Sequence, residues 1–332
     1  MALNRRRLLG TALLGTAGWT LARAGFAATA ASVQSFAPNR AVKLIVPQSA
    51  GGAADRLARV LGKNLEARWK QAVVVENRPG GGVVVGTLAT VRSAPDGYTL
   101  GLLGSSLTIN AVQRKDLPYD IFKDLLPLAR VGYYTVALVA VASFPANDVK
   151  GLIALAKSQP GKLFFGSNGI GTSAHLAGEM LNHMAGIELQ HVPYNGAAKM
   201  YTDMLSGEIP LGISIATSAE PFIKDGRFKV LGVTSTQRSA LYPAWPAIAE
   251  TLPGFESINW AGLVAPAGLS DEVARGISDD ILFVLRAPDM AAMIADMGIE
   301  LSPLAPAEFE AFLRSEITRF TALTKPLGTR MQ

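Results

Sequence analysis

The chain has 332 residues, enough for two domains or one large one, and a formal net charge of +5. Four arginines in the first thirty residues, which hold no acid, carry most of that excess, so about one net positive charge remains beyond them. No clustered basic face remains, which excludes a nucleic-acid surface. The sequence contains no cysteine, which excludes disulfides, thiolate catalysis and thiolate metal sites.

Residues 1–30 have the organisation of an export signal. Arg5, Arg6 and Arg7 precede an uncharged run from 8 to 22, and candidate cleavage sites with small residues at both ends follow, Ala-Arg-Ala at 22–24 and Ala-Thr-Ala at 28–30. These arginines before two leucines resemble a twin-arginine signal, and an ordinary Sec signal with an extra arginine is the alternative. We therefore expect a mature protein that starts near residues 28–32 and works in the periplasm.

Predicted strands and helices alternate along the rest of the chain, which is typical of an α/β fold with largely parallel sheets. In the first part we predict strands at 42–47, 73–76 and 98–103 and helices at 53–68 and 86–92. An uncharged run at 131–144 is shorter than the roughly twenty residues of a membrane-spanning helix and predicts a buried strand.

The alternation continues after that run. We predict helices at 149–158, 173–184 and 197–206, with strands at 162–166, 190–193, 210–215 and 230–234. A strand at 261–265 precedes helices at 271–285, 288–297 and 306–323, the last of them amphipathic. Two lobes are the simplest assembly, with residues 31–138 and 259–332 in the first lobe and 139–258 in the second.

A glycine turn between the first strand and the first helix is a candidate binding site. Gly51 and Gly52 allow close backbone approach, and the helix N-terminus that follows favours an anion. Ser49 can donate a hydroxyl. Asp55, in the first helical turn, can either cap backbone amides or face the cationic end of a ligand, and both interpretations stay open.

A second strand–glycine–helix turn lies at 166–180, with Ser167, Gly171, Thr172 and Ser173 as candidate contacts. A phosphate-binding P-loop would need lysine at the position of Thr172, and the glycine spacing does not match a dinucleotide fingerprint. Two anion-binding turns in separate halves of the chain suggest that a ligand is held between two lobes.

Polar side chains at other strand ends are further candidates, because ligand sites of α/β proteins form at the carboxyl ends of strands. They are Ser105, Ser106, Tyr194 and Thr217. Ordinary turn chemistry is the alternative for the hydroxyls. For Trp260, near a predicted crossing between the lobes, we favour core packing over a role as a wall of the ligand site.

Metal and catalytic sites find little support. His175, Glu179 and His183 recur every four residues, but the zincin spacing is missing and a helix-surface pair explains them equally well. No Gly-x-Ser-x-Gly elbow occurs, and no nucleophile stands out. We expect no metal, no other cofactor and no catalytic residue.

In this order the motifs resemble the tripartite tricarboxylate transporter receptor family, the Bug or TctC-type periplasmic solute-binding proteins. The resemblance runs from about residue 38 to 320. Its marks are the segments 45–59, 76–80, 95–100, 117–124, 171–179, 192–196, 233–238, 253–256 and 260–268.

The resemblance implies a two-lobed, type II periplasmic-binding-protein fold that closes on a small organic carboxylate. It also implies a non-enzymatic receptor that delivers its ligand to the membrane permease of a tripartite carrier, and we expect a monomer. By this resemblance Ser49, Gly51, Gly52 and Asp55 contact the ligand from one lobe, and Gly171, Thr172 and Ser173 from the other. A ligand sensor for a signalling partner and an exported hydrolase that uses His175 or His191 are the alternatives.

Overall fold

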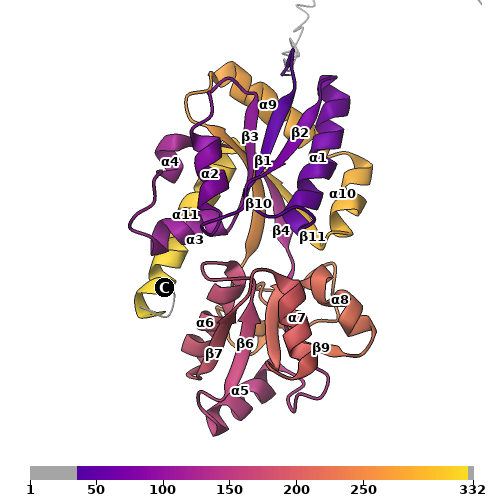
Figure 1. The fold of residues 1–332 in the computed structure, drawn as a ribbon, viewed down its shortest axis with the longest axis vertical. Coiled ribbons are helices and arrows are strands. Elements are labelled where there is room, and N and C mark those ends of the chain that lie inside the picture. The colour runs from indigo at the N-terminus through magenta and orange to yellow at the C-terminus, as the bar shows by residue number, and fades with distance from the viewer. Residues whose placement is uncertain (1–35, 328–332) are drawn as a thin grey trace, which may run out of the picture. The chain divides into compact units, whose positions relative to one another are not determined.

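The computed structural model describes residues 36–327, so the predicted export signal lies outside the described residues. Within them, eleven strands form two sheets (Figure 1). The first sheet has the order β11-β4-β10-β3-β1-β2 and the second the order β7-β6-β8-β5-β9. These two sheets, with their helices, form the two-lobed α/β fold that the sequence predicts.

The first sheet combines a parallel half with an antiparallel half. β1 (Val42–Val46) pairs in parallel with β2 (Val73–Asn77) and β3 (Thr99–Gly104). β10 (Asn259–Pro266) runs antiparallel to β3 and to β4 (Leu125–Tyr134), and the edge strand β11 (Ile299–Leu304) runs antiparallel to β4.

The second sheet is mixed in the same way. β6 (Leu163–Ser167) pairs in parallel with β7 (Leu189–Pro193) and β8 (Leu211–Ile215). β5 (Val136–Val141) runs antiparallel to β8 and to β9 (Phe228–Val233). The prediction of largely parallel sheets is therefore wrong.

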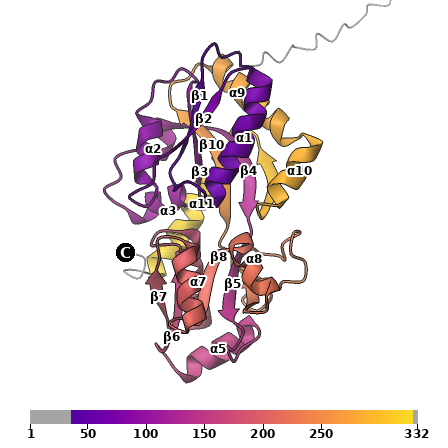
Figure 2. The ribbon, with the colours of Figure 1, turned by 45° about the vertical axis from the view of Figure 1, so that its right-hand side comes forward.

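The uncharged run at 131–144 is divided between the sheets instead of forming one strand. β4 ends at Tyr134 in the first sheet and β5 begins at Val136 in the second, so the chain changes sheets at Thr135 (Figure 2). The amide of Ala216 in the second lobe donates to the carbonyl of Thr135 at 2.8 Å, which fixes the crossing.

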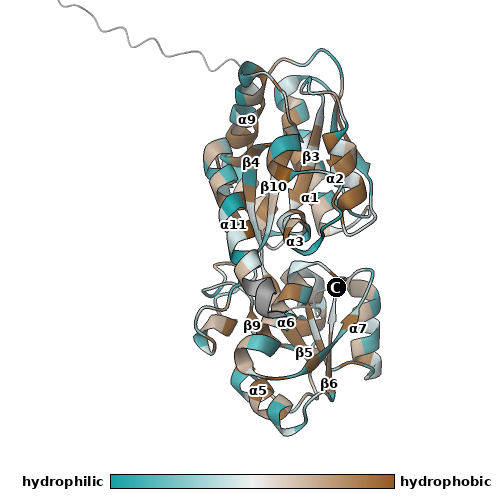
Figure 3. Ribbon diagram, turned by 90° about the vertical axis from the view of Figure 1, so that its left-hand side faces the viewer, coloured by the Kyte–Doolittle hydropathy of each residue, from teal (hydrophilic) through white to brown (hydrophobic). Residues whose placement is uncertain are grey.

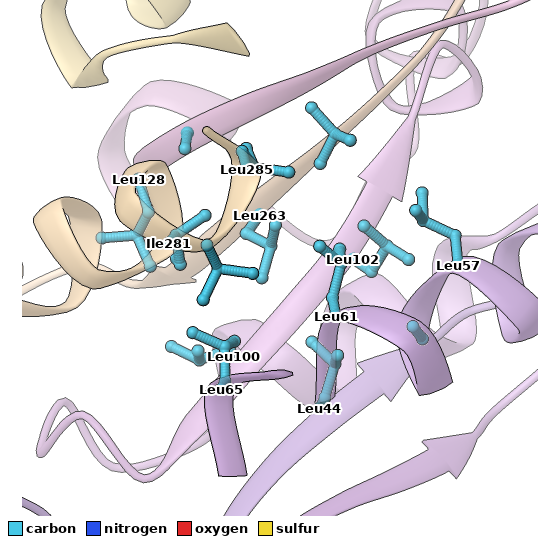
Figure 4. Close-up of a cluster of buried hydrophobic side chains, with 14 of the residues drawn as sticks. Leu44, Leu57, Leu61, Leu65, Leu100, Leu102, Leu128, Leu263, Ile281 and Leu285 are labelled. Carbon is cyan, nitrogen blue, oxygen red and sulfur yellow. The ribbon is translucent and has the colours of Figure 1, made fainter. Parts of the chain in front are cut away.

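Three helices pack on one face of the first sheet and bury its largest leucine-rich core (Figure 4). They are α1 (Ala53–Trp69), α9 (Asp271–Leu285) and α10 (Pro288–Ala295). Leu57, Leu61 and Leu65 recur at helical spacing along α1 and meet Leu44 and Leu100 of the sheet. This core holds α1 firmly, so the position of its N-terminus is well defined.

A second core lies under the other helices of the first lobe. They are α2 (Val84–Val91), α3 (Ser106–Gln113), the single turn α4 (Ile121–Asp124) and α11 (Pro306–Leu327). Trp260 is fully buried here, with its ring 5.4 Å from that of Phe309, so the prediction of core packing is confirmed. Figure 3 shows β3 and β10 largely hydrophobic, while hydrophilic residues lie along α11.

Helices cover the second sheet as well. They are α5 (Val149–Ser158), α6 (Ser173–Ala185), α7 (Ala197–Ser206) and α8 (Ala216–Lys224), with a short 3-10 turn at Ile248–Glu250. Phe320 of α11 also packs into the core of this sheet, and Arg319 donates to the carbonyl of Glu256 at 2.7 Å. α11 thus connects the lobes in addition to the crossings at Thr135 and before β10, and the sequence did not reveal this connection.

Membrane-spanning helices are not found within residues 36–327, because none of the described helices is both long enough and apolar enough to cross a bilayer.

We expect Gly178→Ala to lower the unfolding free energy by about 1–3 kcal/mol through overpacking. A Cβ atom on Gly178 of α6 would lie 2.1 Å from the Cε2 and Cζ atoms of Phe165. Gly62→Ala in α1 is the matched control, since its Cβ would meet Val73 at 3.3 Å and alanine favours the helix. Urea unfolding of both variants measures the difference, and equal stabilities would contradict this packing.

Candidate functional site

The first glycine turn places an uncapped helix end at the surface. Gly51 has a φ of +81°, which favours glycine, and Gly52 is the N-cap of α1 without a side-chain cap. The first amides of a helix have no partner within it, so those of Ala53 and Ala54 are available to an anion. Ser49 is exposed in the same turn.

The carboxylate of Asp55 is directed into this turn. Its Oδ2 accepts from the Gly51 amide at 2.9 Å, and Arg59 donates to both oxygens at 2.9 and 3.0 Å. The hydrogen bond from Arg59 lowers the pKa of Asp55, which is buried. Of the two interpretations of Asp55, this geometry favours the one in which the carboxylate organises the turn.

The second glycine turn presents the N-terminus of α6. Gly169 and Gly171 have φ of +124° and +73°. Thr172 is the N-cap, and its hydroxyl accepts from the His175 amide at 3.3 Å and donates to the Gly169 carbonyl at 2.7 Å. The helix amides that Thr172 does not cap, those of Ser173 and Ala174, are the donors left for a ligand.

Two histidines lie beneath this turn. The hydroxyl of buried Ser167, at the end of β6, lies 2.7 Å from Nε2 of His191 on β7. The His191 ring stacks on His175 of α6, with centroids 4.0 Å apart and an interplanar angle of 19°. Burial, followed by the charge of His175, lowers the pKa of His191 to about 3, so the ring is neutral near pH 7.

Helix α3 brings the glycine segments together, and sequence reasoning missed it. The side-chain amide of Asn110 donates to the carbonyl of Gly82 at 2.6 Å. A Cβ atom on Gly171 would lie 3.5 Å from the amide oxygens of both Asn110 and Gln113. The turn at 169–172 therefore lies next to the glycine run at 80–82.

That glycine run also adjoins the first turn. A Cβ atom on Gly86 would lie 2.6 Å from Cα of Pro47, and the Asn77 side chain donates to the carbonyl of Gln48 at 3.0 Å. The loops at 47–52, 77–86 and 168–172 thus form a continuous series of contacts through Asn110. No local signal in the sequence marks Asn110, whose role depends on the tertiary packing of α3.

Ser105 and Thr217 connect elements of the fold. The buried Ser105 hydroxyl donates to the Ile258 carbonyl and accepts from the Trp260 amide, both at 2.9 Å, which ties β3 to β10. Thr217, in the first turn of α8, donates to the Met297 carbonyl at 3.3 Å. Ser106 is half-buried at the start of α3, whereas Ser105 is buried.

The phenol of Tyr194 is directed toward α7. With Phe164, Lys199 and Asp203 it lines a surface pocket of about 620 Å³. Burial, followed by a hydrogen bond with Asp203, raises the pKa of Tyr194 to about 12. Its backbone amide donates to the Ser167 carbonyl at 3.0 Å, so Tyr194 supports the second glycine turn through its main chain.

The helical triplet of His175, Glu179 and His183 does not converge. His175 and Glu179 are buried, whereas His183 is exposed. Among the residues that the structure describes, no group of three or more histidine, cysteine or acidic side chains is placed to hold a metal ion.

Comparison with known proteins gives consistent similarities. Residues 57–329 match the family described as "Tripartite tricarboxylate transporter family receptor". The chain is 33% identical to the "UPF0065 protein in tcbD-tcbE intergenic region" of Pseudomonas sp. (strain P51), over 97% of this chain and 94% of that protein. It is 32% identical to "Protein BugT" of Bordetella pertussis, over 97% and 99% of the two chains.

Solved structures show the same relationship. The periplasmic binding protein BugD has a TM-score of 0.79 at 29% identity, covering 88% of this chain and 98% of its own. An R. palustris protein solved with adipate has a TM-score of 0.81 at 28% identity, with the same coverage of both chains. The fold and the predicted family resemblance are thereby confirmed.

Proposed function

Because the chain belongs to the tripartite tricarboxylate transporter receptor family, we propose that the α1 and α6 N-termini hold the carboxylate-bearing solute that such a receptor captures. In this family role, the receptor delivers its solute to membrane permease subunits. Two helix ends support this site, and a glycine of positive φ precedes each of them. Asn110 joins the second turn to the glycine run at 80–82, and Gly86 joins that run to Pro47 before the first turn. We place the ligand between the two lobes.

The donors are sufficient for reversible capture. Hydrogen bonds to a charged group contribute about 1.5–3 kcal/mol each, and a micromolar ligand needs about 8 kcal/mol. The amides of Ala53, Ala54, Ser173 and Ala174, aided by hydroxyls such as Ser49 and Ser173, reach that range without a buried arginine. The relative solved with adipate supports a small dicarboxylate as the first ligand to test.

An exported hydrolase is the weaker candidate. Ser167 and His191 have the spacing of a nucleophile and its base, but the Ser167 side chain is fully buried and cannot meet a substrate. A histidine with a pKa of about 3 is also a poor general base near pH 7. These two facts support the proposal of a receptor without enzymatic activity.

Export of the receptor is part of the same proposal. A twin-arginine signal at residues 1–30 would place the mature chain in the periplasm, where the receptor would act as a monomer. We propose the lobes 31–138 with 259–332 and 139–258. The two sheets support a division of this kind, since the chain passes to the second sheet at Thr135, three residues before the proposed boundary, and returns to the first sheet before β10.

We expect the mature protein to bind one carboxylate per chain and to release it unchanged. Thermal-shift screening against mono-, di- and tricarboxylates, aromatic acids and acidic amino acids, followed by titration calorimetry and recovery of the ligand, provides the measurement. Adipate is the first probe. Conversion of the bound compound would contradict a receptor, and no binding across this carboxylate panel would overturn the proposed site.

Thr172→Ala is expected to weaken binding of the best ligand in that panel about tenfold, because the α6 N-cap and its bond to Gly169 are lost. Thr202→Ala on α7 is the matched control. Thr202 is exposed, and among the described residues its hydroxyl has one hydrogen bond, which it donates to the carbonyl of Ala198 one turn back in the helix. Calorimetric titration of both variants decides the matter, and equal affinities would remove Thr172 from the site.

A further inference from the structure

The two histidines beneath the second glycine turn have no role in the proposed capture. His191 lies on β7, His175 lies on α6, and Ser167 ends β6, so three elements meet under the turn at 169–172. Ser167 and His175 are almost completely buried. Buried polar groups in this number are costly unless their hydrogen bonds are satisfied, so their mutual geometry is informative.

Ser167 is hydrogen-bonded to the turn and to His191. Its Oγ accepts from the amide of Gly169 at 3.2 Å and donates to the carbonyl of Gly169 at 3.2 Å. Nε2 of His191 lies 2.7 Å from the same Oγ, which is the shortest of these distances. A hydroxyl both donates and accepts, so Ser167 and His191 are hydrogen-bonded in either neutral tautomer of the ring.

His175 holds the other glycine of the turn. The amide of Gly171 donates to its Nδ1 at 3.4 Å, and its ring is stacked on that of His191. Gly169 is thus bound through Ser167 and His191, and Gly171 through His175. The backbone at both glycines has positive φ, a conformation that glycine also leaves easily, so these bonds select one shape of the turn.

We propose that His191 is a positioning residue, which acts through Ser167 and through its stacking on His175 to hold the turn at 169–172 in its anion-binding shape. This inference rests on the proposed function, because the turn carries the α6 N-terminus to the ligand. It assigns His191 no contact with the ligand itself. Amides must be held to within about half an ångström for such recognition, and the buried side chains of Ser167 and His175 suit that requirement.

Two substitutions at His191 separate stacking from hydrogen bonding. His191→Phe keeps a ring that can stack on His175 but has no acceptor for Ser167, whereas His191→Gln keeps a polar group near the position of Nε2. In the ligand-free protein we expect His191→Phe to speed hydrogen exchange at the Gly169 and Gly171 amides about tenfold, and His191→Gln to remain within about threefold of the unaltered protein.

Affinity for the tightest-binding member of the carboxylate panel should follow the same order, with a loss of about five- to tenfold for His191→Phe and rescue by His191→Gln. Ser167→Ala, a smaller change, should reproduce the His191→Phe effects even where the Phe variant folds poorly. The double variant Ser167→Ala/His191→Phe should be no worse than the more severe single variant. Gln190→Ala, the preceding residue on β7, is the control and should change neither readout.

The two ideas can fail separately. If exchange at Gly169 and Gly171 stays within about twofold of the unaltered protein in both His191→Phe and Ser167→Ala, the positioning role of His191 is overturned. If these variants loosen the turn and yet no carboxylate binds the unaltered protein, the proposed function fails while the structural role of His191 stands. Faster hydrogen exchange at these amides with unchanged ligand affinity would also overturn the proposal, since the shape of the turn would then not affect ligand binding.

Discussion

Asp280→Ala is expected to lower the unfolding free energy by about 3–5 kcal/mol, the range for a buried charge pair that loses one member. Asp280 of α9 is fully buried, and its Oδ1 accepts from Arg68 at the end of α1. Its Oδ2 accepts from the Trp69 indole at 2.8 Å and from the Phe36 amide at 3.1 Å. Removing the carboxylate therefore leaves three donors without their acceptor, in the core that holds α1 in place.

Asp279→Ala is the matched control for this prediction. Asp279 is the preceding residue of the same helix and is exposed, so its loss should change stability by less than about 0.5 kcal/mol. Guanidinium unfolding of both variants, with the slope of the transition checked for two-state behaviour, gives the comparison. Similar midpoints for the two variants would show that Arg68 and Trp69 find other partners at little cost.

The elements that flank the two glycine turns could be predicted because their signals are local. Gly51 and Gly171 have the positive φ that glycine permits, and buried strands precede both turns. The helices at Val149–Ser158, Ala197–Ser206 and Asp271–Leu285 have the predicted bounds, since caps, turn residues and helical periodicity agree there.

Strand direction could not be predicted in the same way. β4, β5 and β10 are buried on both faces and are largely apolar, apart from Arg130 in β4, as parallel strands usually are. They nevertheless run antiparallel to their neighbours. β11 is half-buried, contains Pro303 and pairs irregularly at the sheet edge. Its sequence therefore lacks the alternation that would predict a strand.

The parts of the site that were missed depend on tertiary contacts. α3 has eight residues, several of them β-branched, and its N-cap Ser105 makes no side-chain cap, so packing stabilises it. Asn110 and Gln113 gain their place beside Gly171 only because α3 packs there. The stacked pair of His175 and His191 joins residues on different elements, and no spacing in the sequence indicates that contact.

Acid is expected to destabilise the ligand-free protein through His191. The ordinary pKa of histidine is about 6.5, whereas burial, followed by the charge of His175, lowers the pKa of His191 to about 3 in the folded state. Above pH 7 both states carry the neutral ring, so the group has no effect on stability. Between pH 6.5 and 3 the unfolded chain binds one proton more than the folded chain, so stability falls as the pH falls.

One extra proton corresponds to a slope of about 1.4 kcal/mol per pH unit, and since His191 is partly exposed we expect a loss of about 2 kcal/mol between pH 6.5 and 4.5. His191→Gln removes the titrating group and should lack this part of the acid loss. Buried carboxylic acids such as Glu316 titrate alike in both proteins and cancel in the comparison. The interaction between the stacked rings of His175 and His191 is lost in His191→Gln, so the measured difference includes it. Gln190→Ala, at the preceding residue of β7, leaves His191 in place and should keep the full slope. Urea unfolding at several pH values measures these slopes. If the unfolding free energy falls equally with and without His191, this ring is protonated as readily in the folded protein as in the unfolded chain.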